Sequence, residues 1–418
     1  MRKTLYQMAE EFGITDTGST VTVPCWDFVA TIPEFKELAK KETVSRWHME
    51  KNMFTHTKLV CEEMQKEISA VDTELITRFS DSEKLVLMFA ALFHDIGKCR
   101  CENNEEGKLL SNGHPAISEK LCRKILWDME IVWRERICEI VRWHDLYCSS
   151  DISDRKLVTK ISQLSPWLFI HIDLLYAMFR ADDLGSVKSD ELKGSAEKMV
   201  YRMDSILHSM NFHITSNSSK VKFGEFTVYV MCGLPGSGKS TWCSSNLPGI
   251  PLVSRDLIRE ELGMTEKGVK FMGTPEQEDL VSKISVGRVN NFCEKKQSFV
   301  YDNMNSREKY RKAFLESIRK YKPVVRFIYL EVNDLSLLEA RRPEIAAHDA
   351  DKGYRVFERM VENMEFPRPY EYDTIDIYQD YSDLSVRHEI DKEIGYIHLQ
   401  ETKPKHECTT GETGHLKI

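Results

Sequence analysis

Histidines and aspartates in the first half of the chain have the residue types of a divalent metal site: His56, the adjacent pair His94 and Asp95, His114, His144 and Asp182. Imidazole and carboxylate together suit Mn, Fe, Co, Ni or Mg in octahedral geometry better than a tetrahedral structural zinc. A carboxylate can bridge two ions, and ions about 3.5–4 Å apart stabilise the attacking and leaving oxygens of phosphoester hydrolysis. The set predicts one or two divalent transition metals (Mn, Co, Ni or Fe) and removal of a phosphoryl group.

Other interpretations of these residues are open at this point. His144 lies on the apolar face of its expected helix, where it could be a hydrogen-bonded core histidine. Asp183 is the alternative to Asp182 because the two are adjacent. Cys99 and Cys101 could bind metal, although a lone C-x-C lacks the second pair of a structural zinc site.

A second motif lies in the C-terminal half. Residues 233–240 read GLPGSGKS and follow FTVYVMCG, a run typical of a buried strand. In such a loop, backbone N–H groups surround the phosphates of ATP or another NTP, while Lys239 reaches the β and γ phosphates and Ser240 binds Mg. The residues expected to bind nucleotide are Gly233, Leu234, Pro235, Gly236, Ser237, Gly238, Lys239, Ser240 and Thr241, of which Lys239 is also catalytic.

The segment after the next expected strand could bind the phosphoryl acceptor. In VSRDLIREEL, Asp256 and Arg259 are three residues apart and face the same way at a helix start. Asp256 can accept the proton of an attacking hydroxyl, and Arg259 can hold an acceptor phosphate through two hydrogen bonds. The alternative is an ordinary helix start with a charged first turn.

The composition limits the class of protein. A chain of 418 residues is too long for one core, which predicts two domains. It has 41% hydrophobic and 30% charged residues, no signal peptide and no apolar run of about 18 residues, so we expect no membrane segment. A net charge of −8 argues against nonspecific coating of nucleic acid, and eleven cysteines without a secretory signal favour reduced thiols in the cytoplasm.

The hydrophobic pattern changes once along the chain. Residues 46–212 are mostly helical in pattern, including a helix with Ser82 as N-cap and a buried helix over PWLFIHIDLLYAMFRADDLGS that ends near Gly185. Strands and helices then alternate, which indicates a parallel sheet. We therefore expect a multidomain protein, an all-α domain followed by an α/β P-loop domain. The expected boundaries are 1–212, a polar linker over 213–225, 226–399, and a disordered polar tail over 400–418.

The N-terminal ligand order H…HD…H…H…D resembles the HD-domain phosphohydrolase superfamily over residues 46–185. The resemblance implies that His56, His94, Asp95 and Asp182 hold one ion. It implies that Asp95, His114 and His144 hold the second ion, so that Asp95 is shared.

The C-terminal half resembles the phage-type polynucleotide 5′-kinases over residues 226–380. Their pattern is a P-loop, then R-D-x-x-R, then a D-N-T-N-like strand end and an arginine-bearing lid. The third element here is DNMN at 302–305, with methionine in place of the usual threonine. The resemblance implies that Asp302 contributes to the acceptor site. It also implies that a lid arginine neutralises the transferring phosphoryl group; Arg341 and Arg342 match the start of the lid and Arg355 lies near its end.

The order of the two domains resembles the bifunctional end-healing enzymes called HD-Pnk. These remove 2′-, 3′- or 2′,3′-cyclic phosphates from RNA or DNA ends and phosphorylate 5′-hydroxyl ends with ATP. No K-x-D-G ligase signature occurs in the chain, so a separate ligase is implied. Two alternatives are a nucleotide-pool enzyme, with an HD nucleotidase fused to a small-molecule kinase, and a regulatory ATP-binding protein with a sensor HD module.

Overall fold

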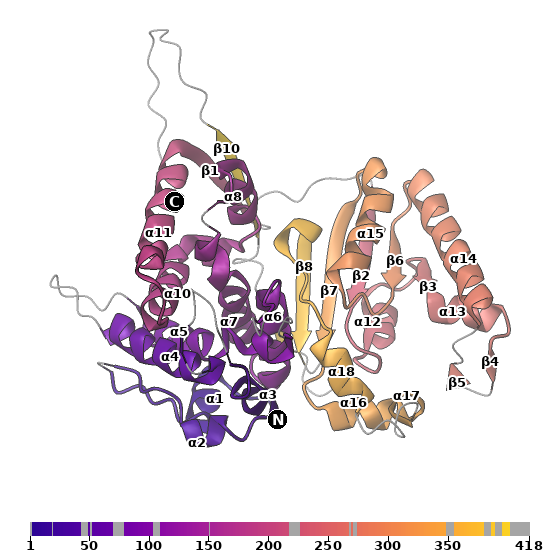
Figure 1. The fold of residues 1–418 in the computed structure, drawn as a ribbon. Coiled ribbons are helices and arrows are strands. Elements are labelled where there is room, and N and C mark those ends of the chain that lie inside the picture. The colour runs from indigo at the N-terminus through magenta and orange to yellow at the C-terminus, as the bar shows by residue number, and fades with distance from the viewer. Residues whose placement is uncertain are drawn as a thin grey trace, which may run out of the picture.

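The fold has a helical N-terminal part and a C-terminal part that combines helices with a sheet (Figure 1). The computed structural model describes residues 2–18, 20–42, 49–50, 52–69, 79–102, 109–149, 151–216, 226–266, 269–270, 274–347, 355–379, 386–388 and 395–401. The prediction of an all-α domain followed by an α/β domain with a parallel sheet is confirmed.

The helical part surrounds α5 (Asp81–Phe93), in which every residue from Lys84 to Phe93 is buried. A helix that is apolar on all sides is stable only inside a core. Its N-cap is Ser80 rather than the predicted Ser82, because Ser80 and Glu83 exchange side-chain-to-backbone hydrogen bonds in a capping box. The other helices here are α1 (Leu5–Glu11), α2 (Trp26–Val29), α3 (Pro33–Leu38), α4 (Met53–Ser69), η1 (Ile96–Arg100), α6 (His114–Ile125), α7 (Ile131–Trp143), η2 (His144–Cys148), α8 (Asp154–Ile161), α9 (Pro166–Ile170), α10 (Ile172–Gly185), η3 (Asp190–Leu192) and α11 (Ser195–Ser209).

The segment predicted as one buried helix over PWLFIHIDLLYAMFRADDLGS forms two helices, α9 and α10. The backbone of His171 leaves the helical region between them, with φ −100° and ψ 40°. The predicted end near Gly185 agrees with the structure.

The α/β part contains a six-stranded sheet in the order β3-β6-β2-β7-β8-β9. Neighbouring strands are parallel except β8 and β9, which are antiparallel. The strands are β2 (Thr227–Cys232), β3 (Leu252–Ser254), β6 (Phe299–Asp302), β7 (Val324–Glu331), β8 (Thr374–Gln379) and β9 (Val386–His388). In parallel sheets of this kind, ligands bind at the carboxyl ends of the strands, which is where the P-loop follows β2.

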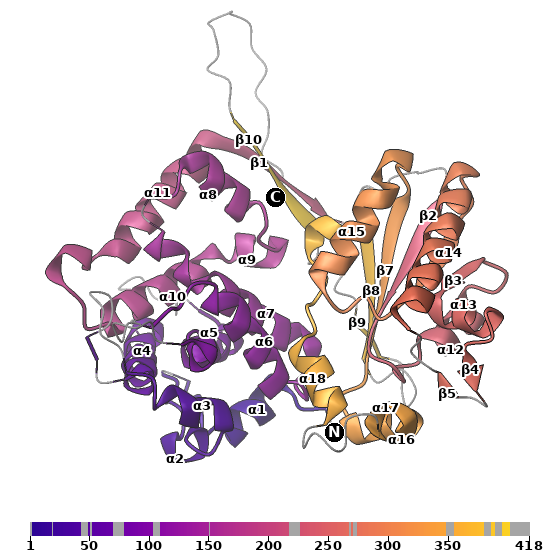
Figure 2. The same cartoon turned by 45° about the vertical axis from the view of Figure 1, so that its right-hand side comes forward.

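Helices cover this sheet, and a short β4–β5 hairpin lies beside it (Figure 2). The elements are α12 (Lys239–Asn246), α13 (Arg255–Glu261), β4 (Thr265–Glu266), β5 (Val269–Lys270), α14 (Pro275–Glu294), α15 (Glu308–Ile318), η4 (Arg319–Tyr321), α16 (Leu335–Arg341), α17 (Pro343–Ala347), α18 (Val356–Glu362) and η6 (Pro369–Glu371).

A two-stranded ribbon joins the two ends of the α/β part. β1 (Met210–Ser216) pairs antiparallel with β10 (Gly395–Glu401). β1 includes the first four residues of the expected linker 213–225, and β10 includes the first two of the expected tail 400–418. Pairing between segments so distant in sequence satisfies their backbone groups and is not visible in local composition. The remainder of the expected linker and tail, 217–225 and 402–418, lies outside the described residues.

The two parts pack against each other through α6, α7 and their connection. Trp127 and Ile131 belong to the hydrophobic core of the α/β part, where they pack with Phe327, Tyr329 and Tyr372. α6 lies beside α18 in both views (Figures 1 and 2). None of the helices in the described ranges is long and apolar enough to cross a membrane.

Candidate metal centre and nucleotide site

Five separate elements bring the predicted metal ligands together. His56 lies in the first turns of α4, and His94 and Asp95 follow α5 directly. His114 begins α6, His144 follows α7, and Asp182 lies in the last turn of α10. All six side chains are buried. Helix ends are suited to this task because their side chains project beyond the packed helix and can converge.

Each of three imidazoles is fixed through its Nδ1 atom. The Nδ1 atoms of His94, His114 and His144 lie 2.7 to 2.8 Å from the carbonyl oxygens of Ala91, Ser111 and Val141. A carbonyl oxygen can only accept, so in each neutral ring Nδ1 carries the proton and Nε2 carries a lone pair. This orienting contact on the far nitrogen is typical of metal-binding histidines.

The Nε2 atoms meet around Asp95. His56 Nε2 lies 3.1 Å from His94 Nε2, and both lie 3.4 Å from Asp95 Oδ2. His114 Nε2 lies 3.2 Å from His144 Nε2, at 2.8 and 3.4 Å respectively from Asp95 Oδ1. Lone pairs that face one another and a carboxylate repel, and divalent cations between them remove that repulsion. The donors form two groups that share Asp95, His56 with His94 and His114 with His144, and each group could hold one divalent ion.

Asp182, not Asp183, faces this cluster. Its Oδ1 atom lies 3.2 Å from His56 Nε2 and 3.6 Å from His94 Nε2, and it accepts no hydrogen bond from the described residues. Asp183 instead forms an ion pair with Lys188 and accepts a hydrogen bond from the N–H of Gly194 at 3.1 Å.

The C-x-C pair shows no sign of metal binding. The two groups in the described residues that could hold an ion contain no cysteine. Burial raises the pKa of the Cys99 thiol to about 11, which disfavours the thiolate that a metal would require.

Two residues near the metal centre were not predicted. Lys98 Nζ donates to Asp95 Oδ2 at 2.6 Å and is buried. Burial alone would raise the pKa of Asp95, but the positive charge of Lys98 holds it well below its usual value. The spacing of three residues from Asp95 was a usable signal for Lys98. Glu50 Oε1 lies 3.3 Å from His56 Nδ1, and no helical spacing pointed to it.

Two glycines allow the ligand-bearing helices to approach closely. A Cβ atom on Gly97 would lie 2.5 Å from the carbonyl oxygen of His114, so only glycine lets η1 meet the start of α6. A Cβ atom on Gly185 would lie 2.7 Å from the Cα atom of Val60, which brings α10 against α4.

The P-loop connects β2 to α12 with backbone that requires glycine. Gly233, Gly236 and Gly238 have φ of 145°, 82° and 96°. The N–H of Gly233 donates to the carbonyl oxygen of Met304 at 3.1 Å, which ties the loop to the DNMN segment after β6. Other nucleotide-binding residues expected from the sequence, Leu234, Pro235, Ser237, Ser240 and Thr241, lie in this loop or the first turn of α12.

Lys239 begins α12, and its side chain reaches back to the loop. Its Nζ atom donates to the carbonyl oxygens of Gly233 and Leu234, each at 2.9 Å. Burial lowers the pKa of Lys239, and the nearby carboxylates of Asp302 and Asp256 oppose this shift. The loop lysine and both predicted acceptor-side aspartates therefore share one edge of the sheet.

Arg259 is held by a partner that the sequence did not reveal. Its Nη1 atom donates to Asp256 Oδ1, and its Nε and Nη2 atoms donate to the two oxygens of Glu278, all at 2.8 Å. Glu278 lies in the first turn of α14 and also binds Arg255. No local spacing connects Glu278 to α13, because the contact is tertiary.

Of the two predicted lid arginines, Arg341 contacts the P-loop. Its Nη1 atom donates to the carbonyl oxygen of Gly236 at 3.0 Å. Arg342 also lies against Gly236, and its Nε atom donates to Glu344. Both come from the C-terminal end of α16; the middle of the expected lid, 348–354, lies outside the described residues.

Family comparisons agree with this division of the chain. Residues 52–163 match the family model of the HD domain, and residues 228–367 match a family model described as an AAA domain. The first match includes every predicted ligand except Asp182, and the second extends from β2 past the lid arginines. No curated protein matches the sequence. The chain therefore combines an HD domain with a C-terminal P-loop kinase-like domain, the two domain types of an enzyme with phosphatase and kinase activity.

Proposed function

We propose that this protein heals broken nucleic-acid ends. It removes 2′-, 3′- or 2′,3′-cyclic phosphate from one end and phosphorylates the 5′-hydroxyl of the other end with ATP. One observation carries the proposal: the chain has two kinds of site. Two pairs of histidines converge on Asp95 in one module, and a P-loop whose Lys239 lies near Asp256 is in the other. The modules are taken as 1–212 and 226–399, and a separate ligase would use the products.

In the phosphoesterase module, the ligand distances support His56, His94, Asp95 and Asp182 around one ion and Asp95, His114 and His144 around the other. When bound, a divalent pair would supply charge stabilisation to the oxygens of the phosphoester. The imidazole-rich donor set favours Mn, Co, Ni or Fe over Mg. Lys98 keeps Asp95 ionised, and the buried walls exclude bulk water.

In the kinase module, the P-loop N–H groups and Lys239 hold the ATP phosphates, and Ser240 carries Mg. Asp256 accepts the proton of the 5′-hydroxyl, while Arg259 and Asp302 position the acceptor. Arg341 and Arg342 lie beside Gly236 and neutralise charge on the transferring group.

The surface of α15 supports a nucleic-acid strand as substrate. Lys309 and Lys312 of α15, and Arg319 and Lys320 of η4 directly after it, are exposed, and in the described part of the chain no carboxylate pairs with them. Tyr310 is 58% exposed beside Lys309. α15 begins shortly after the DNMN segment, which contacts the P-loop. The cations of α15 and η4 could therefore contact the part of a strand that extends beyond the proposed acceptor site. Cations and exposed aromatic rings together are the means by which proteins hold single strands.

The decisive experiment offers the purified protein ATP, Mg and one transition metal with three substrates. These are a single strand with a 5′-hydroxyl and a 3′-phosphate, the corresponding nucleoside, and the nucleoside 3′-phosphate. We expect both ends of the strand to be processed with higher kcat/KM than either small molecule. Preference for the free nucleoside would favour a nucleotide-pool enzyme, and ATP binding without turnover would favour a regulatory protein.

A further inference from the structure

A fully buried ion pair connects the HD module to the kinase sheet. Arg134, in the first turn of α7, donates from Nη1 to Glu331 Oε1 at 2.8 Å and from Nη2 to Glu331 Oε2 at 2.7 Å. Neither side chain is exposed to solvent. Glu331 is the last residue of β7, so this arginine grips the carboxyl end of a central strand in the other module.

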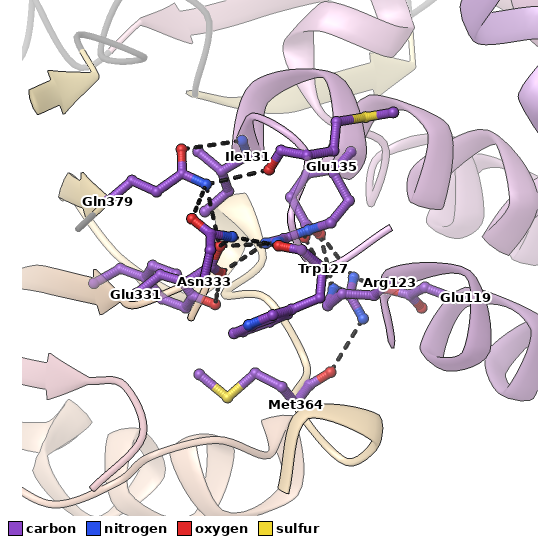
Figure 3. Close-up of polar contacts among 12 residues, drawn as sticks. Glu119, Arg123, Trp127, Ile131, Glu135, Glu331, Asn333, Met364 and Gln379 are labelled. Atoms are coloured by element: carbon purple, nitrogen blue, oxygen red, sulfur yellow. Dashed lines mark hydrogen bonds and ion pairs between the residues drawn. The ribbon is translucent and has the colours of Figure 1, made fainter. Parts of the chain in front are cut away.

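Further hydrogen bonds fix the chain that follows Glu331 (Figure 3). Asn333 donates to the carbonyl oxygen of Trp127 and accepts from Gln379 Nε2 at 2.8 Å. Trp127 Nε1 donates to the carbonyl oxygen of Val332 at 3.3 Å. Glu331 is therefore hydrogen-bonded to Arg134 at the start of α7, and Val332 and Asn333 are hydrogen-bonded to Trp127 in the connection between α6 and α7.

The same segment supports the nucleotide loop. A Cβ atom on Gly233 would lie only 2.3 Å from the carbonyl oxygen of Leu330, so the P-loop rests directly on the backbone that precedes Glu331. Beyond Asn333 the chain enters α16, which carries Arg341 to the carbonyl oxygen of Gly236. The end of β7 therefore packs directly against the P-loop, and it also fixes where α16, which carries the lid arginines, begins.

We propose that Arg134 is a positioning residue for the kinase site, so that the HD module completes the nucleotide site of its neighbour without contacting the nucleotide. A fork with two hydrogen bonds holds a strand end more rigidly than a single charge does. Rigid placement of a loop raises affinity because less ordering is needed when the ligand binds. The inference rests on the proposed kinase function.

The test separates positioning from folding. Removing one member of a buried pair leaves an unpaired buried charge, so Arg134→Met alone is uninformative, whereas apolar replacement of both members is often tolerated. The informative variant is Arg134→Met/Glu331→Met in the full chain. Arg202→Met/Asp154→Met is the control for loss of an ion pair elsewhere, because that partly exposed pair, with a contact of 2.9 Å, lies inside the HD module.

Calorimetric titration with ADP and Mg measures nucleotide affinity, and thermal unfolding measures stability. We expect the interface variant to fold with a lower unfolding temperature, because Tyr329, Asn333 and Gln379 lose a buried acceptor, and to bind ADP about tenfold more weakly at a temperature where it is fully folded. The control should bind as the wild type does. If the interface variant fails to fold, Arg134→Lys, which keeps the charge and removes the fork, should show the weaker binding.

Two outcomes overturn the inference, and they differ. If the folded interface variant binds ADP as tightly as the wild type, the inference is wrong and the proposed function stands. The same holds for Arg134→Lys when the double variant does not fold. A wild-type protein that binds no ADP overturns the proposed function and this inference together.

Discussion

Arg259 donates to Asp256 across 2.8 Å, one turn apart on α13. Asp256 remains 42% exposed in its side chain, whereas Arg259 is only 14% exposed and is held from behind by Glu278. The pair therefore presents a carboxylate to solvent with a cation fixed beside it. In the proposed kinase reaction, this carboxylate would accept the proton of the hydroxyl while the cation holds the neighbouring phosphate.

Asp256→Ala should abolish phosphorylation of 5′-hydroxyl ends, because the attacking hydroxyl no longer has its proton acceptor. Loss of a general base costs about 10²–10⁴-fold in rate. Release of phosphate from 3′ ends by the same preparation is the internal control and should be unchanged. A variant with the full kinase rate would show that the base lies elsewhere.

Arg259→Ala should raise the KM for the acceptor or lower kcat while the affinity for ATP changes little. Glu278→Gln should produce a milder form of the same defect, because it weakens the two hydrogen bonds that orient Arg259 without removing the guanidinium. Steady-state kinetics with each substrate varied in turn makes the distinction. Loss of ATP affinity alone would place Arg259 on the donor side.

Lys309→Gln/Lys312→Gln should weaken the binding of a single strand. It should have a smaller effect on phosphorylation of a nucleoside 3′-phosphate, which is too short to reach this surface. For each phosphate that a lysine no longer neutralises, the slope of log K against log salt should fall by about 0.7. Fluorescence anisotropy at several salt concentrations measures this slope. Lys36→Gln/Lys156→Gln, two exposed lysines of the HD module, is the matched control. An unchanged slope in the α15 variant would remove this surface from the strand path.

Gly185→Ala should destabilise the protein and reduce phosphoesterase activity, because the added methyl group would lie 2.7 Å from the Cα atom of Val60. Overpacking of this kind costs about 1–3 kcal/mol and would displace Asp182. The control is Gly287→Ala in α14, where an added Cβ meets nothing within 4 Å. Thermal unfolding of the two variants gives the comparison; equal stability would show that α10 and α4 can separate at no cost.

Local patterns were sufficient to predict the architecture and several parts of the site. The run before Gly233 and the P-loop spacing predicted a strand, a turn and a helix, because each depends on neighbouring residues. The order of histidines and aspartates predicted the residues that converge on Asp95. The choice between Asp182 and Asp183 required the structure, since it depends on which face of α10 meets α4.

What the sequence did not reveal depends on pairing between distant segments. Glu278 reaches Arg259 from another helix, and Arg134 reaches Glu331 from another module. No period or spacing within a segment encodes such pairs. The ribbon of β1 and β10 was missed for the same reason, because each strand alone looks like a polar connection.

We propose that two chemically separate sites, one in each module, act on the two ends of a strand. The most direct measurement follows both ends of one strand, with a 5′-hydroxyl and a 3′-phosphate, in the presence of His94→Ala protein. His94 contributes one of the four Nε2 atoms around Asp95, and the P-loop lies in the other module, between β2 and α12. We predict that the 3′-phosphate is retained, that bound transition metal falls, and that the 5′ end is phosphorylated at the wild-type rate. Removal of the 3′-phosphate at the wild-type rate by this variant would show that the residues around Asp95 do not carry out the phosphoesterase reaction.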